Sequence, residues 1–244
     1  MAKERVLLKI SGETLLKVFD EPSETQTKIG YNRKAINFIA EEIVSVKDLF
    51  ELAVVIGGGN LIRGTQLREE VLLQDGVVAD YAGMLGTVVN AIVFQEILEK
   101  DFGLETRVQT GLEVKSVAEP FIRRKAVSHL RKGRIVIFAG GTGNPDFSTD
   151  TAMVLRAYEI GASLILKGTK VDGIFDKDPN SFKDASFIPQ VSYIDYLNRH
   201  LKIVDETAVT LASKHSLVLK VFNIFKEGNL RKILTGENIG SKIS

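Results

Sequence analysis

Five short apolar runs rich in β-branched residues recur along the chain and predict buried strands. Runs of this kind, without a polar residue at every second position, are typical of strands covered on both faces. They lie at residues 5–10, 52–56, 134–138, 163–166 and 217–222. Between them, apolar residues at three- and four-residue spacing predict helices, one from Ile36 to Phe50 and another from about Asp80 to Lys100. The alternation predicts an α/β fold, a three-layer α/β/α sandwich with a largely parallel central sheet.

The helix predicted for residues 80–100 carries apolar side chains almost all round its surface. We expect it to be either enclosed in the core or covered by another subunit of an oligomer. No apolar run approaches the roughly 20 residues that cross a bilayer, and the first residues lead into a strand without a signal-type apolar region. The sequence therefore predicts a cytoplasmic protein.

The composition favours one domain with no bulk attraction to polyanions. The 244 residues show no linker, so we expect a single domain over residues 1–244. Lys and Arg number 32 and Asp and Glu 31, a net charge of +1, so any anion binding must be local. The absence of cysteine excludes disulfides and thiol nucleophiles. The basic residues between Arg123 and Lys132 are most simply a solvated helix face, and the three histidines lack metal-ligand spacing.

Residues suited to anions follow the first two predicted strands. Ligands of open parallel sheets bind beyond the carboxyl ends of the strands. Lys9, Ser11 and Gly12 end the first strand, and a lysine there suits a phosphoryl group in transfer, although a solvated lysine would look the same. Three glycines at residues 57–59 and then Arg63 follow the second strand. They suit phosphate binding by backbone N–H groups and a guanidinium fork, although a glycine run is also a common tight connection.

A later loop, residues 139–150, combines three glycines, hydroxyl groups and an amide side chain after a strand. Ser148 or Thr149 can cap the helix that follows, and free N–H groups at a helix start favour phosphate. Asp150 is therefore either a carboxylate favoured by the helix dipole or one that orients catalytic lysines. This loop predicts a second anion-binding site.

The fourth predicted strand is followed by Lys167, Thr169, Phe175 and Asp178. Phe175 either stacks on a base or anchors the loop to the core, and Asp178 either accepts from ribose hydroxyl groups or closes a turn. Asp80, at the predicted start of the long helix, is either its N-cap or another acceptor for ribose hydroxyl groups.

Five segments carry a resemblance to a known family. They are Lys-Ile-Ser-Gly-Glu at 9–13, Gly-Gly-Gly-Asn-Leu-Ile-Arg-Gly at 57–64, Asp-Tyr-Ala-Gly-Met-Leu-Gly-Thr at 80–87, Gly-Thr-Gly-Asn-Pro at 141–145 and Lys-Val-Asp-Gly-Ile-Phe at 170–175. In this order the chain resembles the amino acid kinase fold family, and within it the bacterial enzymes that phosphorylate uridylate (UMP). The resemblance extends from residue 5 to about residue 240.

The resemblance implies transfer of the γ-phosphoryl group of ATP to UMP, giving UDP in pyrimidine nucleotide biosynthesis, with Mg²⁺ entering with ATP. It implies that Lys9 and Lys167 neutralise charge during transfer, that Asp150 orients them, and that Asp172 supports the Lys167 loop. The implied ATP site comprises Lys9, Ile10, Ser11, Gly12, Gly59, Arg63, Thr169, Phe175 and Asp178. The implied UMP site comprises Gly58, Asp80, Thr142, Gly143, Asn144, Pro145, Asp146, Phe147, Ser148 and Thr149. No metal site made by protein residues alone is implied.

Regulation and assembly are also implied by the resemblance. Members are commonly homohexamers built from dimers and are usually inhibited by UTP. Relatives that GTP activates carry a glycine-rich segment where this chain reads Lys-Val-Phe-Asp-Glu-Pro-Ser at 17–23, so activation by GTP is left open. Asp146 stands where many relatives have an aromatic residue, and its charge either points to solvent or tunes affinity for an anionic acceptor.

Other functions have less support in the sequence. No P-loop, GxGxxG or Gly-x-Ser-x-Gly pattern occurs at the glycine-rich segments. A kinase of carbamate or of an acylated amino acid shares single motifs, and Asp80 argues against it weakly. A nucleotide-binding protein without activity also keeps such a fold, but Lys9, Lys167 and Asp150 are all present.

Overall fold

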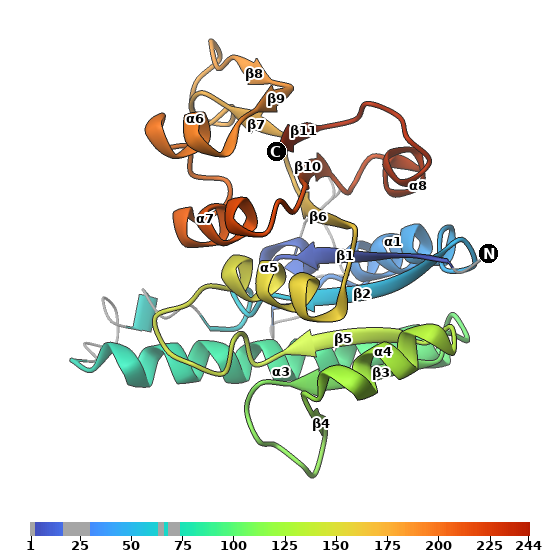
Figure 1. The fold of residues 1–244 in the computed structure, drawn as a ribbon. Coiled ribbons are helices and arrows are strands. Elements are labelled where there is room, and N and C mark those ends of the chain that lie inside the picture. Colours follow the sequence, from blue (N-terminus) through green and yellow to red (C-terminus); the bar gives the residue numbers. More distant parts are fainter. Residues whose placement is uncertain (1–2, 17–29, 63–65, 68–73) are drawn as a thin grey trace.

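A nine-stranded sheet forms the centre of the molecule (Figure 1). The computed structural model describes residues 3–16, 30–62, 66–67 and 74–244. Neighbouring strands are parallel except for one antiparallel pair, β10 with β11. From edge to edge the strands are β4 (Glu119–Pro120), β3 (Thr106–Thr110), β5 (Ile135–Ala139), β2 (Phe50–Ile56), β1 (Glu4–Ile10), β6 (Leu164–Thr169), β10 (Leu219–Asn223), β11 (Ser241–Ile243) and β9 (Gln190–Val191). The predicted α/β class with a largely parallel sheet is confirmed.

Helices cover both faces of this sheet, which gives three layers (Figure 1). Successive residues of β1 alternate between two hydrophobic cores, because strand side chains point to opposite faces in turn. One face packs against η1 (Gly12–Leu16), α1 (Arg33–Val44), α3 (Gly76–Lys100) and α8 (Asn229–Leu234). The other packs against α4 (Arg123–Arg131), α5 (Thr149–Ile160), α6 (Tyr193–Asn198) and α7 (Glu206–Lys214). A separate antiparallel pair, β7 (Ile174–Phe175) and β8 (Phe187–Ile188), follows β6.

Helix α1 is shorter than its apolar spacing predicts. The Asn32 side chain caps its start by accepting from Ala35 N at 3.3 Å. The helix ends at Val44, and turn hydrogen bonds to the Val46 carbonyl reverse the chain before β2. The prediction that the helix reaches Phe50 is therefore wrong, since Phe50 begins a strand.

Helix α3 begins earlier than predicted and is a core helix of a soluble protein. Its N-cap is Asp75, whose side chain accepts from Val77 N at 2.9 Å. By length and composition it is apolar enough to cross a membrane, which the sequence analysis did not anticipate, but about half of it is buried inside this fold. Its outer face leaves an apolar stripe exposed, formed by Val77, Tyr81, Leu85 and Val89.

Candidate active site

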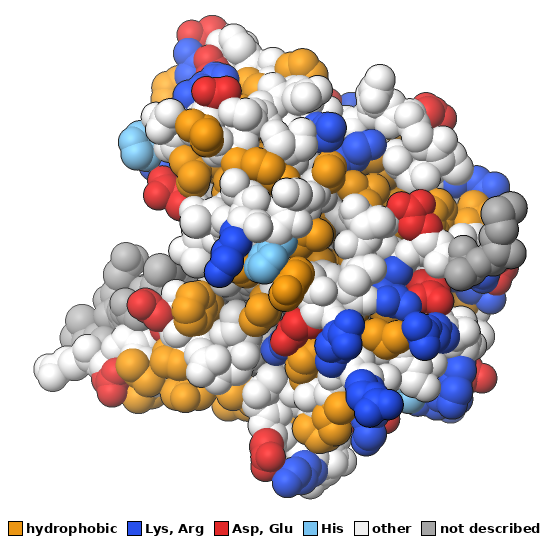
Figure 2. Space-filling model, in the orientation of Figure 1, with side chains coloured by type: hydrophobic (Ala, Val, Ile, Leu, Met, Phe, Trp, Pro, Cys, Tyr) orange, Lys and Arg blue, Asp and Glu red, His pale blue; other side chains and the backbone are white. Residues whose placement is uncertain are grey.

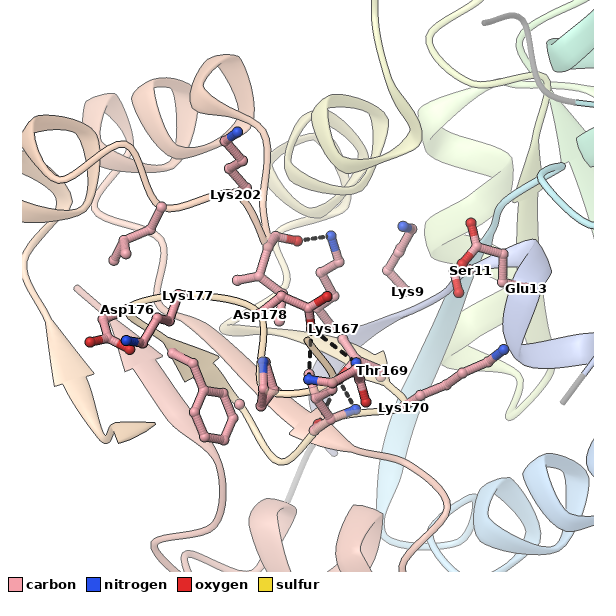
Figure 3. Close-up of a pocket in the computed structure, with 18 of the residues that line it drawn as sticks. Lys9, Ser11, Glu13, Lys167, Thr169, Lys170, Asp176, Lys177, Asp178 and Lys202 are labelled. Carbon is pink, nitrogen blue, oxygen red and sulfur yellow. Dashed lines mark hydrogen bonds between the residues drawn. The ribbon is translucent and has the colours of Figure 1, made fainter. Parts of the chain in front are cut away.

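Lys9 and Lys167 face each other across two adjacent central strands. β1 and β6 pair in parallel with Lys9 opposite Lys167, so both side chains point to the same face of the sheet. Both residues lie toward the carboxyl ends of their strands, where ligands of parallel sheets bind. Strand β1 lies between β2 and β6 in the sheet. Both are buried, and Figure 3 shows their ammonium groups directed into the same space.

A carboxylate from α5 joins these two lysines. Ser148 caps α5 by accepting from the N–H groups of Asp150 at 2.9 Å and Thr151 at 3.3 Å. This cap holds Asp150 in the first turn, where Lys9 Nζ lies 2.9 Å from its Oδ1. Lys167 Nζ donates to Oδ2 of the same carboxylate and to the carbonyl of Ile203. We call Lys9, Asp150 and Lys167 the lysine–aspartate cluster.

Burial and mutual attraction set the charges of this cluster. Burial alone would raise the pKa of Asp150, but the ammonium groups of Lys9 and Lys167 outweigh it and hold that pKa well below its usual range. Burial lowers the pKa of Lys167 to about 8, and the nearby Lys9 ammonium adds to this effect while Asp150 opposes it. Asp150 therefore stays ionised at neutral pH, whereas Lys167 loses its proton only a little above neutrality.

Asp205 holds the start of α5 in place and was not selected from the sequence. It is the N-cap of α7 and accepts from Ala208 N at 2.6 Å. The Ser148 hydroxyl donates to it, and Thr151 Oγ1 lies 3.2 Å from its Oδ1. Its negative charge also raises the pKa of Lys167 slightly against the effect of burial. In the sequence, Asp205 shows only the ordinary signal of a helix cap.

The lysine–aspartate cluster opens into a cavity of 860 Å³, drawn in Figure 3. Five residues of the predicted ATP site line this cavity, namely Lys9, Ser11, Thr169, Phe175 and Asp178. Further charged residues that the sequence analysis did not select line it too, namely Glu13, Lys170, Asp176, Lys177 and Lys202. Most of them follow the carboxyl end of β1 or β6, and this position in the sequence could have identified them. The cavity is therefore rich in lysines, with aromatic Phe175 on its wall.

The other predicted ATP-site residues do not line this cavity. Ile10 is buried in the core beneath it. Gly12 begins η1, and a Cβ there would lie 2.6 Å from Gly59 N, so only glycine allows the two loops to touch. Gly59 therefore lies beside Gly12. Arg63 lies outside the described residues.

A second cavity, of 170 Å³, lies between the glycine loop after β2 and the start of α3. Four residues of the predicted UMP site line it: Gly58, Asp80, Phe147 and Thr149. A Cβ on Gly58 would lie 2.8 Å from the Gly83 carbonyl of α3, so glycine is required for this close packing. Other lining residues were not assigned to the predicted UMP site, namely Ile62, Ala79, Gly83, Met84, Thr87 and Gly141.

Asp80 is not the N-cap of α3, because Asp75 has that role and Asp80 lies one turn further on. Its Oδ2 instead accepts from Asp146 N at 2.8 Å. This contact joins α3 to the loop after β5. A second contact does the same, since Thr87 Oγ1 accepts from Gly140 N at 2.7 Å.

The remaining loop residues predicted for UMP lie around the second cavity without lining it. They are Thr142, Gly143, Asn144, Pro145, Asp146 and Ser148. Thr142 Oγ1 accepts from Asn144 N at 3.1 Å, which fixes the turn. Asp146 is exposed and has φ of 74°, a left-handed conformation that aspartate tolerates better than bulky residues. An aspartate therefore suits the backbone conformation at this position.

Two carboxylates after β6 also have structural partners. Asp172 forms an ion pair of 2.8 Å with Lys226 and accepts from Asn223 Nδ2 at 3.2 Å, which ties its loop to the end of β10. Asp178 accepts from Asn180 N and from Ser181 Oγ, both at 2.9 Å, and so closes a turn at the cavity wall. Among the described residues, no group of three or more His, Asp or Glu is placed to hold a metal ion.

Comparisons with known proteins agree with this geometry. Residues 4–230 match the amino acid kinase family. The chain is 48% identical to the uridylate kinase of Wolinella succinogenes over 241 residues, which is 97% of this chain and 94% of that one. It is also 48% identical to the uridylate kinase of Sulfurimonas denitrificans over 244 residues, covering 98% and 97% of the two chains.

A solved structure shows the same fold. The crystal structure of UMP kinase from Bacillus anthracis superposes with a TM-score of 0.90 at 39% identity, covering 100% of this chain and 97% of that one. The similarity includes the strands that carry both cavities.

The substitution Asp150→Asn is expected to destabilise the protein by about 3 kcal/mol or more, because it leaves two buried ammonium groups without their ionised partner. Thermal or urea unfolding measures this change. Asp172→Asn is the matched control, since its ion pair is exposed and such pairs contribute about 1 kcal/mol or less. Equal, small losses in both variants would contradict the central role of Asp150.

Proposed function

Since the chain belongs to the amino acid kinase family and is a uridylate kinase, we propose that its two cavities hold the two nucleotides of one phosphoryl transfer. ATP occupies the larger cavity and UMP occupies the smaller one. The γ-phosphoryl group passes between them at the lysine–aspartate cluster and UDP is released, a step of pyrimidine nucleotide synthesis. The observation that supports this most is the in-register pair of buried lysines beside a cavity of nucleotide size.

The larger cavity suits ATP in both size and charge. Four lysines besides Lys9 line it, namely Lys167, Lys170, Lys177 and Lys202, so a chain of phosphates is opposed by several ammonium groups. Phe175, half-buried on the wall, offers a face on which adenine stacks. Asp178 accepts from the ribose hydroxyl groups with the lone pairs that its turn leaves available.

The smaller cavity suits the UMP nucleoside. Asp80 accepts one backbone N–H from Asp146, and a carboxylate has capacity for further donors such as ribose hydroxyl groups. The loop of residues 142–149 borders the same cavity and leads into α5, whose positive N-terminal end favours the UMP phosphate. Gly58 lets the backbone approach the nucleotide closely.

The reaction asks for charge stabilisation rather than a strong base. The acceptor oxygen belongs to a phosphate that is already ionised at neutral pH. The barrier arises from bringing two anions together, so positioned cations lower it. We assign this role to the ammonium groups of Lys9 and Lys167, and we assign to Asp150 the role of holding both in place.

Magnesium fits this site as an ion carried by ATP. Two of the three carboxylates that line the larger cavity already accept protein hydrogen bonds: Asp178 from its own turn and Asp176 from Ser186 N at 2.7 Å. They are not gathered into a ligand set. Mg²⁺ is commonly bound by phosphates and water with few protein ligands. When bound, it would neutralise part of the phosphate charge.

Assembly, regulation and location extend the proposal. The exposed stripe of α3 supports self-association, since large apolar patches on soluble proteins mark interaction surfaces. The homohexamer itself and inhibition by UTP rest on the family resemblance. Activation by GTP stays open, since residues 17–23 depart from the glycine-rich segment of relatives that GTP activates and lie outside the described residues. We further propose that residues 1–244 act as one domain and that the enzyme works in the cytoplasm.

A test of acceptor identity is ADP release from Mg-ATP with UMP, CMP, dUMP, carbamate or acetylglutamate supplied separately. We expect release with UMP to exceed the no-acceptor control and every other acceptor. Preference for carbamate or acetylglutamate would overturn the substrate assignment, and no release with any acceptor would favour a protein that binds nucleotides without activity.

The same assay applied to Asp80→Asn tests the smaller cavity. We expect KM for UMP to rise about tenfold or more, because a charged acceptor of ribose hydroxyl groups is lost, while KM for ATP changes little. Asp48→Asn, an exposed aspartate on another surface, is the control. An unchanged KM for UMP, or an equal rise for both nucleotides, would remove Asp80 from the UMP site.

Activity is expected to fall at alkaline pH. Lys167 neutralises phosphate charge only when protonated, and its pKa is lowered to about 8 by burial. Because kcat/KM reports the free enzyme, kcat/KM for ATP should decline as pH rises through about 8. Melting temperature recorded at each pH shows whether the fold is intact. A constant kcat/KM up to about pH 10, near the usual lysine pKa, would contradict the assigned role.

A further inference from the structure

Helix α6 carries a buried tyrosine whose hydroxyl group binds the backbone beside the lysine–aspartate cluster. Tyr196 is wholly buried. Its hydroxyl donates to the Val204 carbonyl at 2.9 Å and accepts from Val204 N at 2.7 Å. Figure 1 shows α6 and α7 side by side, and Figure 2 shows hydrophobic side chains at the surface over them. The hydroxyl is therefore the polar end of an apolar contact, and it fixes one residue of the connection between the two helices.

The residues on either side of Val204 both reach the cluster. The Ile203 carbonyl accepts from Lys167 Nζ. Asp205 contacts the two hydroxyl groups at the start of α5, the helix that carries Asp150. One phenol thus holds the residue that lies between an acceptor for the catalytic lysine and the anchor of the catalytic carboxylate.

The connection between α6 and α7 has little regular structure of its own. Helix α6 ends at Asn198 and α7 begins at Glu206. Between them, His200 adopts a left-handed conformation with φ of 49°, and Leu201 N donates to the Tyr196 carbonyl at 3.3 Å. A connection outside helices and strands is more mobile than the elements that it joins. Its position therefore depends on side-chain contacts such as that of the Tyr196 hydroxyl.

We propose that Tyr196 is a positioning residue of the phosphoryl transfer, which acts by holding residues 203–205 against the lysine–aspartate cluster. This inference rests on the charge-stabilising role assigned above to Lys167. Tyr196 lines neither cavity, so it acts through the backbone of its neighbours rather than on a nucleotide. A buried tyrosine hydroxyl usually has a partner, but here the partner lies between two contacts with the cluster.

Three charged groups and one neutral group face Lys167 or its immediate partners. Burial lowers the pKa of Lys167, and Lys9 from β1 adds to this effect, whereas Asp150 from α5 and Asp205 from the start of α7 raise that pKa. Tyr196 from α6 stays neutral, because burial raises the pKa of its hydroxyl above the usual range. The backbone carbonyl that accepts from the ammonium group favours the protonated lysine. Displacing this carbonyl should therefore lower the pKa of Lys167 further.

The test compares the wild type with Tyr196→Phe and with Tyr193→Phe, through the pH profile of kcat/KM for ATP. Tyr193→Phe is the matched control, since it removes a hydroxyl group of the same helix that donates to the Leu217 carbonyl at 2.7 Å, before the amino end of β10. Both variants keep the aromatic ring. Other ionisable groups of the cavity wall, among them His200 and Lys202, are the same in all three proteins.

We expect the alkaline decline of Tyr196→Phe to begin about one pH unit lower, because a hydrogen bond to the protonated lysine is weakened. Its kcat at pH 7 should fall about tenfold, while KM for UMP changes by about twofold or less, since a misplaced cation affects the transfer step rather than binding. Tyr193→Phe should keep the wild-type profile and kcat. Assays below the lowest melting temperature of the three proteins exclude unfolding as the cause.

The outcomes separate this inference from the role of Lys167. A wild type without a decline near pH 8 would contradict that role, and the inference with it. A wild-type decline that stays in place in Tyr196→Phe would overturn the positioning role alone, as would equal changes in both variants. Hydrogen exchange of the wild type gives a measurement that needs no variant: the Val204 amide should exchange slowly, and rapid exchange there would also overturn the inference.

Discussion

Two ammonium groups in register on adjacent central strands repel each other, and the structure depends on the carboxylate that holds them together. Like charges directly opposite on neighbouring strands are destabilising. Lys9 and Lys167 occupy such a pair of positions, largely out of water, and Asp150 contacts both. The cluster keeps one positive charge in excess. That excess is unfavourable in the free protein and favourable when phosphate arrives, so the same feature that limits stability suits phosphoryl transfer.

The rest of the fold supports this one contact. The order of strands places β1 between β2 and β6. The lysines, the glycine loop and the start of α5 therefore come together at the carboxyl ends of these strands. Ser148 fixes the start of α5, and Asp205 ties that start to α7. On the other side, Asp80 and Thr87 hold the loop after β5 against α3. Each cavity is therefore bounded by elements that are also tied to the cluster.

Much of this arrangement follows from the sequence, and the failures have physical causes. Strands β1, β2, β5, β6 and β10 are visible because most of their residues are apolar and many of these are β-branched. Strand β3 is not, because it buries polar side chains such as Gln109, whose partner Glu119 comes from β4. Strands of two or three residues carry no periodic signal. The spacing of apolar residues wrongly predicted that α1 extends to Phe50 and that α3 starts at about Asp80. Backbone turns and the Asp75 cap decide these boundaries, and apolar spacing does not reveal them. Asp205 was missed because its task depends on a contact with distant α5.

The most direct measurement is the rate of phosphoryl transfer in a single turnover of the Lys9→Ala variant, with ATP and UMP both bound. If the lysine–aspartate cluster stabilises the charge in transfer, this rate should fall by roughly 100-fold or more, while the affinities for the two nucleotides change far less. Unfolding measured alongside shows that the variant remains folded. A folded variant that transfers the phosphoryl group at nearly the wild-type rate would contradict the account.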